Sequence, residues 1–259
     1  MTISRRESLR TLGIALTSAG LASTGLAATA PAGTLLPPDA YTLGALTRRL
    51  GSLPRRRDFK SVPMILDRRS LWDAEALDAV LQYPGGPKQS WDNTEISGPW
   101  LSVMRNAINS QIWAFRHPNF LCVSVTHGTA QFALYSDAMW EKYGLAKLAG
   151  GNVTGDNFVT APPAAAHNPK DYQDTSGVFS ARANSLQVLQ RRGAVFMACH
   201  NAMWEMCERL IAADVNPDKL TTETMCAEFT DHLIPGVVLT PGAVGTLVEL
   251  ARAGFSYAR

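Results

Sequence analysis

The sequence has few cysteines and no long apolar run, and each shortage excludes a class of protein. Four Cys among 259 residues are too few for a disulfide-stapled scaffold. The longest mildly apolar stretch, Thr11 to Ala30, is diluted by Gly and Thr, whereas a membrane span needs about 20 predominantly apolar residues. The glycine spacing of a dinucleotide-binding fingerprint is also missing, since the segment from Thr240 to Gly245 does not match it.

An excess of charge is likewise absent. The 24 Lys and Arg residues against 22 Asp and Glu residues give a formal charge of +2, which argues against a nucleic-acid partner. With 46% hydrophobic and 18% charged residues, the composition is typical of a soluble globular protein, and the length suits one domain with an attached segment.

The first 32 residues have the three-part layout of an export signal. Paired arginines in Ser4-Arg5-Arg6-Glu7-Ser8-Leu9-Arg10 precede the mildly apolar run. The segment resembles a twin-arginine (Tat) signal, although Ser8 stands where that motif has an aromatic residue. The resemblance implies export of a folded protein to the periplasm by the Tat translocase, with Ala27, Ala28 or Ala32 as the last signal residue.

Removal of this leader changes the charge balance. Arg5, Arg6, Arg10 and Glu7 leave with it, so the remaining chain carries equal numbers of basic and acidic residues. A local basic stretch persists between Arg48 and Arg69. It is either a solvated run or inter-subunit strap, or a surface that collects an anion or an acidic partner.

The remaining chain predicts one α/β domain at 58–259, preceded by a linker and basic strap at 33–57 that contains a short helical piece around 43–50. Strands are expected at 62–66, 120–125, 194–198, 236–239 and 255–257, and helices at 71–81, 99–115, 129–143, 185–192, 200–213, 221–231 and from Thr240-Pro241 to Gly254. In the last of these helices, Val244, Leu247, Val248 and Ala251 form the expected buried stripe. A long loop is expected at 145–177. Alternating strands and helices predict a mainly parallel sheet with helices on both faces.

Two residues are expected at the edge where such sheets bind ligands. His127 and Cys199 both follow predicted strands, and ligands of parallel sheets bind at the carboxyl ends of strands. Cys199 also precedes a helix, whose N-terminus favours the thiolate, and His127 or His200 could stabilise that thiolate or carry a proton. The amides at the helix start could hold an anionic substrate. The alternative is that Cys199 is a small buried residue that fills a strand end.

A second hypothesis concerns metal. Met197, Cys199, His200, Met203, Met206 and Cys207 fall within eleven residues. Thiolate, thioether and imidazole groups suit Cu(I), so Cys199, His200, Met203 and Cys207 form an alternative copper site. Met203 and Met206 would equally form an ordinary core stripe.

The remaining observations concern assembly and cysteine pairing. Six Trp residues could anchor a non-catalytic binding module. Cys199 and Cys207 lie about 12 Å apart along a helix, at about 1.5 Å per residue, which is too far for a disulfide. Cys207 and Cys226 could pair if their helices are adjacent, with free thiols as the equal alternative, while Cys122 is expected to pack in a buried strand.

Between residue 62 and the C-terminus the chain resembles the DsrE/DsrF-like family. The resemblance lies in His127-Gly128 after a strand, Arg192-Gly193 before a strand, Ala198-Cys199 at its end, Pro235-Gly236-Val237-Val238 with Pro241-Gly242, and Ala253-Gly254-Phe255-Ser256-Tyr257. It implies a small α/β domain that assembles as a trimer or hexamer. It further implies a sulfur-relay role, with Cys199 at the position of the sulfur-accepting Cys that carries a persulfide and with a small sulfur-containing ligand.

Overall fold

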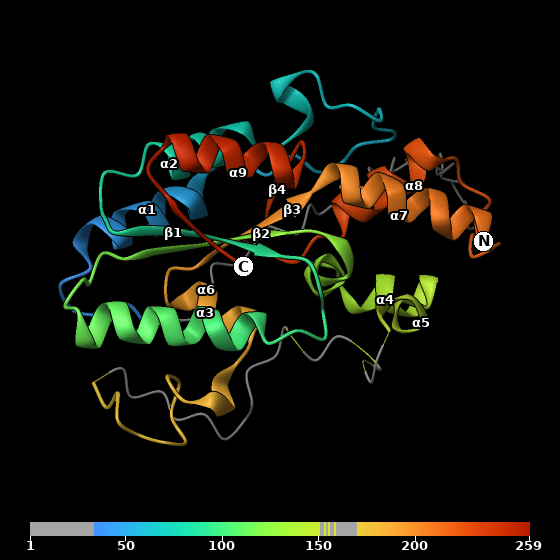
Figure 1. Ribbon diagram of the computed structural model, residues 1–259. Helices are drawn as coiled ribbons and strands as arrows, with labels where there is room; N and C mark the ends of the chain where they lie inside the picture. The colour runs from blue at the N-terminus through green and yellow to red at the C-terminus, as the bar shows by residue number, and fades with distance from the viewer. Residues whose placement is uncertain (1–33, 151–152, 154, 156–157, 159–169) are drawn as a thin grey trace, which may run out of the picture.

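The computed structural model describes residues 34–150, 153, 155, 158 and 170–259, so the Tat-like leader and much of the expected loop at 145–177 lie outside the described residues. Within the described part of the chain, five parallel strands form one sheet in the order β4-β3-β2-β1-β5 (Figure 1). The strands are β1 Lys88–Asn93, β2 Leu121–Thr126, β3 Val195–Cys199, β4 Val238–Thr240 and β5 Ser256–Ala258. The prediction of a parallel α/β sheet is confirmed.

Helices cover both faces of this sheet (Figure 1). One face carries α1 (Tyr41–Ser52), α2 (Ala74–Leu81) and α9 (Ala243–Arg252), and the other carries α3 (Trp100–Asn109), its π-helical continuation η2 (Ser110–Ala114) and α6 (Leu186–Arg191). Beyond the carboxyl ends of the strands lie α4 (Asp137–Tyr143), α5 (Leu145–Ala149), α7 (His200–Ala212) and α8 (Thr222–Asp231). Short 3-10 turns occur at η1 (Arg69–Leu71), η3 (Gly128–Leu134) and η4 (Ala181–Ala183). No helix among the described residues is long and apolar enough to cross a membrane.

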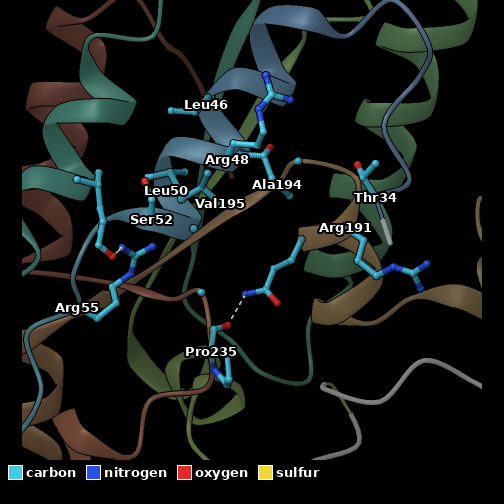
Figure 2. Close-up of a pocket in the computed structure, with 16 residues that line it drawn as sticks. Thr34, Leu46, Arg48, Leu50, Ser52, Arg55, Arg191, Ala194, Val195 and Pro235 are labelled. Atoms are coloured by element: carbon cyan, nitrogen blue, oxygen red, sulfur yellow. Dashed lines mark hydrogen bonds between the residues drawn. The ribbon is translucent and has the colours of Figure 1, made fainter. Parts of the chain in front are cut away.

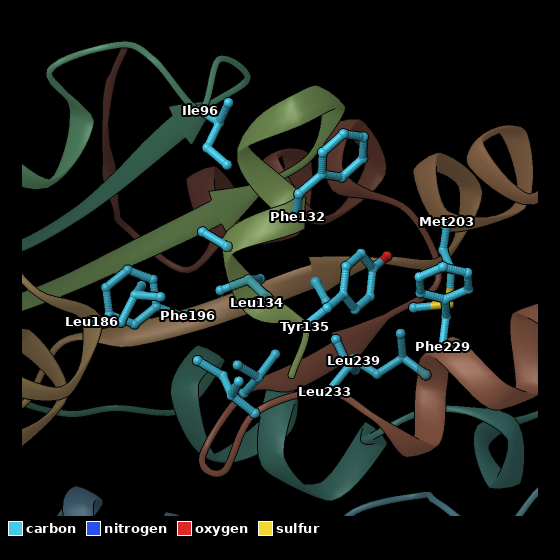
Figure 3. Close-up of a cluster of buried hydrophobic side chains, with 14 of the residues drawn as sticks. Ile96, Phe132, Leu134, Tyr135, Leu186, Phe196, Met203, Phe229, Leu233 and Leu239 are labelled. Carbon is cyan, nitrogen blue, oxygen red and sulfur yellow. The ribbon is translucent and has the colours of Figure 1, made fainter. Parts of the chain in front are cut away.

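Strand β2 is buried along its whole length because it is covered on both sides. Successive side chains of a strand point to opposite faces, so Val123 and Val125 join the core under α1, α2 and α9, while Cys122 joins the core under α3. The core under α3 continues past the sheet to α7 and α8. There Tyr135 packs edge-on against Phe229, with the ring centroids 4.8 Å apart (Figure 3).

The first expected strand is wrong. Residues 62–66 form no strand. Val62 and Leu66 are buried, but Met64 and Ile65 are exposed because Pro63 and the lack of a neighbouring strand leave the middle of the segment on the surface. One of the interior strands of the sheet is instead β1, whose polar sequence carries no strand signal. It is held by β2 on one side and β5 on the other, and its Trp91 is buried.

Two helix predictions are also corrected. The helix expected at 129–143 is interrupted at Tyr135, which forms an isolated β-bridge with Leu233. The 3-10 helix η3 precedes Tyr135, and α4 follows it. In α9, Val244 and Val248 of the expected buried stripe face outward, 69% and 55% exposed, whereas Leu247 packs partly buried against the core. The helix instead begins at Ala243, because Thr240 remains in β4 and donates its hydroxyl to Ala198 O.

The segment expected as a linker and basic strap is tied into the domain. Leu43 and Leu46 of α1 are buried against the sheet. After α1, the chain passes Asp73, a fully buried carboxylate that accepts the amides of Arg56 at 2.5 Å and Leu239 at 2.7 Å and the guanidinium of Arg57 at 3.2 Å. These contacts fasten the strap to β4, which favours a structural role for this part of the basic stretch.

Replacement of Asp73 tests that role. Asp73→Ala leaves two buried backbone amides and one guanidinium without their acceptor, so we expect the free energy of unfolding in urea to fall by about 3 to 5 kcal/mol. Asp67→Ala is the matched control, because Asp67 pairs with Arg68 while both side chains are 71% exposed, and it should cost less than about 1 kcal/mol. Equal losses in the two variants would contradict the assignment.

Candidate active site at the carboxyl edge of the sheet

The structure places both strand-end residues as the sequence predicts. Cys199 is the last residue of β3, and His127 directly follows β2. The register pairs Thr126 with Ala198, so His127 and Cys199 are the next residues along two hydrogen-bonded strands. Both therefore occupy the edge of the sheet at which parallel α/β proteins bind ligands.

The sulfur of Cys199 receives amides from two helices. Its Sγ accepts the Ala202 N–H at 3.3 Å from the first turn of α7, and the Ala243 N–H at 3.1 Å from the first residue of α9. The first amides of a helix have no intrahelical acceptor and carry partial positive charge. Two helix N-termini thus converge on one sulfur atom, where the sequence had indicated a single helix.

The backbone of Cys199 is fixed by Gln131, a residue that the sequence did not single out. The Gln131 side chain accepts the Cys199 N–H at 2.8 Å and donates to the Cys199 carbonyl at 3.0 Å. It also donates to the Tyr135 hydroxyl at 2.7 Å, and it is buried. A glutamine on a buried face was the available signal, but the break of the expected helix at Tyr135 hid which way it points.

Two opposing effects act on the Cys199 thiol. Burial raises the pKa of Cys199 above its ordinary value, and the amides of Ala202, Ala243 and Asn201 pull it down by a smaller amount. Cys199 is only 4% exposed. The expectation that the helix N-terminus favours thiolate is therefore correct for the helix alone, but desolvation outweighs it.

A second polar cluster at this edge, formed by His127, Asp92 and Tyr257, connects the ends of three strands by hydrogen bonds. His127 Nε2 lies 2.7 Å from Asp92 Oδ1, and the Tyr257 hydroxyl donates to Asp92 Oδ2 at 2.8 Å. A carboxylate accepts the imidazole proton, so neutral His127 carries its hydrogen on Nε2 and keeps the lone pair on Nδ1. The pKa of Tyr257 is raised, first by its hydrogen bond to Asp92. Sequence reasoning missed Asp92 because β1 was not recognised as a strand.

His200 is directed elsewhere. Its Nε2 donates to the Pro63 carbonyl at 2.8 Å, and its ring is buried with Nδ1 unpartnered. Burial lowers the pKa of His200, which keeps the ring neutral. This histidine anchors the surface segment around Pro63, and no described hydrogen bond links it to the Cys199 sulfur.

The four residues of the alternative copper site have separate partners. Cys199 binds amides, His200 binds Pro63, Met203 Sδ accepts the Thr230 hydroxyl at 3.4 Å, and the Cys226 thiol donates to Cys207 Sγ at 3.2 Å. Across the described ranges, no three His, Cys, Asp or Glu side chains gather as a metal-binding group. The copper site stays a prediction that these contacts do not favour.

The remaining cysteines are buried free thiols. Burial raises the pKa of Cys122 to about 12, and burial with the neighbouring Cys226 raises that of Cys207. Helices α7 and α8 are adjacent, and Cys207 and Cys226 face each other as free thiols with their Sγ atoms 3.2 Å apart.

The direction of the Cys199 shift gives a pH prediction. Because burial raises its pKa, the thiolate fraction is small at neutral pH and grows as pH rises past the ordinary value of 9.0. We expect the rate of Cys199 alkylation by iodoacetamide, followed by peptide mass spectrometry, to keep rising beyond that pH, with circular dichroism confirming that the fold persists. A rate that levels off below pH 7 would instead show that the helix amides dominate.

Comparison with models of known protein families yields no match for this chain, and neither the curated proteins nor the solved structures contain a match.

Proposed function

We propose that the protein is an exported, DsrE-like sulfur carrier in which Cys199 accepts sulfane sulfur as a persulfide. The observation that carries the proposal is the convergence of the α7 and α9 amides on Cys199 Sγ at the carboxyl edge of the sheet. A persulfide anion on this atom would keep those amide donors and their partial positive charge. The resemblance of the His127-Gly128 and Ala198-Cys199 segments to sulfur-relay proteins supports the same chemistry, and the Tat-like leader supports a periplasmic location.

The transfer step balances with thiosulfate as the donor. The Cys199 thiolate attacks the outer sulfur of thiosulfate, a new S–S bond forms at Sγ, and the S–S bond of thiosulfate breaks. Sulfite leaves with the electron pair of that bond, and the cysteine retains one extra sulfur atom as a persulfide. No external oxidant or reductant is needed.

The thiol proton needs an acceptor, and His127 is the residue we assign to it. His127 lies at the neighbouring strand end, and Asp92 holds its Nε2–H so that Nδ1 keeps the lone pair. Asp92 acts through His127 and is therefore a positioning residue. Its second oxygen is held by Tyr257, which fixes the carboxylate in one orientation.

Persulfide formation tests this assignment. After exposure of the protein to thiosulfate, intact mass spectrometry should show one added sulfur, and Cys199→Ser should abolish it. Cys122→Ser is the matched control, because Cys122 is also buried but lies near the amino end of β2, away from the carboxyl edge, and it should leave labelling unchanged. Asp92→Asn should slow labelling by at least about tenfold and displace its pH profile. Undiminished labelling of Cys199→Ser would overturn the proposal.

A specific observation also favours the alternative of an oligomeric binding module. Helix α9 exposes Val244 and Val248, which lie four residues apart on one helix face, and exposed apolar residues that share a face are a candidate contact between copies. Most of the Trp residues that the sequence offered as anchors are instead buried or half-buried. We therefore propose that α9, and not the tryptophans, forms the contact between copies in a trimer or hexamer.

Light scattering tests this contact. Val248→Glu places a charge in the proposed interface, so we expect the particle to fall to the mass of one chain. Ile65→Glu is the control, since Ile65 is also exposed but lies on the distant surface segment, and it should leave the mass unchanged. A monomeric wild-type protein would exclude the interface.

A further inference from the structure

A cavity of about 510 Å³ lies at the edge of the sheet opposite Cys199 and His127. It is lined by the start of β3 at Ala194 and Val195, by the turn before β4 at Pro235 and Gly236, and by the second half of α1 (Figure 2). Its volume falls within the range of small-molecule sites, roughly 300 to 1,000 Å³. None of the residues proposed for sulfur transfer lines it.

The walls of this cavity are largely aliphatic. Leu46 and Leu50 come from α1, Leu53 follows that helix, and Val195 comes from the sheet. The backbone approaches closely here because Gly193 has φ +88°, and a Cβ at this position would lie 2.7 Å from Leu43 Cδ2. Such walls suit an apolar chain or ring, since burial of apolar surface is favourable.

The charged residues around the cavity all have one sign. Of the described residues that line it, Arg48, Arg55 and Arg191 are basic and none is Asp or Glu (Figure 2). Arg55 is half-buried, and it donates to the carbonyls of Val237 at 3.1 Å and Leu53 at 3.2 Å, which supply no negative charge. Burial lowers the pKa of Arg55 by more than the nearby Asp73 carboxylate, which does not line the cavity, raises it, so a bound anion would further stabilise this desolvated cation.

We propose that this cavity binds an amphipathic anion, a small molecule with an aliphatic body and a carboxylate head. The aliphatic body occupies the space between α1 and the start of β3, and the head pairs with the guanidinium groups at the rim. Arginine is well suited to this task, because its planar fork matches the two oxygens of a carboxylate. The proposal does not depend on the sulfur-carrier function, since it concerns the opposite edge of the sheet.

Calorimetric titration of the full chain with three probes tests the ligand class. Decanoate has both the tail and the charge, decanol lacks the charge, and acetate lacks the tail. We expect decanoate to bind with one site per chain, and decanol and acetate to bind at least about tenfold more weakly, because a charge-assisted hydrogen bond is worth about one order of magnitude in affinity or more.

Variants of neighbouring arginines locate the site. The double variant Arg48→Gln/Arg55→Gln should weaken decanoate binding by at least about tenfold. Arg49→Gln is the matched control, because Arg49 is the next residue on α1 but does not line the cavity, and it should bind as the wild type does. Absence of decanoate binding, equal binding of decanol, or equal loss in the two variants would each overturn the proposal. An unchanged urea midpoint in the double variant excludes misfolding as the cause of weakened binding.

Discussion

The site depends on how the chain is fixed at the end of β3. Gln131 holds both backbone groups of Cys199, and the Cys199 sulfur accepts amides from α7 and α9. One residue thereby joins the sheet to the helix that follows it and to a helix that begins more than forty residues later. Buried backbone groups must find partners, so Gln131 supplies an acceptor and a donor to Cys199 just beyond the last residue of β2 that pairs with β3.

The same arrangement sets the chemical character of the edge. Burial of the Cys199 sulfur suppresses the thiolate, while the converging amides favour any anion that forms there. A buried thiol of this kind has a low thiolate fraction. If a negative charge develops on the sulfur, amides that are already oriented stabilise that charge without reorganisation. Asp92 lies on β1 and His127 directly follows β2, so their hydrogen-bonded pair is at the same edge of the sheet.

The sheet separates this chemistry from the cavity. Parallel strands have all their carboxyl ends at one edge and all their amino ends at the other, so a chain of this topology presents two distinct surfaces. The polar, hydrogen-bonded residues gather at the first, and the aliphatic walls with basic residues gather at the second. Strand β3 spans the distance between them, beginning at the cavity and ending at Cys199.

The sequence by itself determined the elements whose signals are local. The apolar run of β2, the capped helix α8 and the position of Cys199 between a strand and a helix follow from propensity, capping and periodicity. Only the tertiary structure decided the elements that depend on neighbours: β1 is a strand because β2 and β5 pair with it, and α9 turns Val244 outward because Thr240 stays in β4. The roles of Asp92 and Gln131 have no local signal, since hydrogen bonds between residues 35 and 68 positions apart arise only when the sheet has formed.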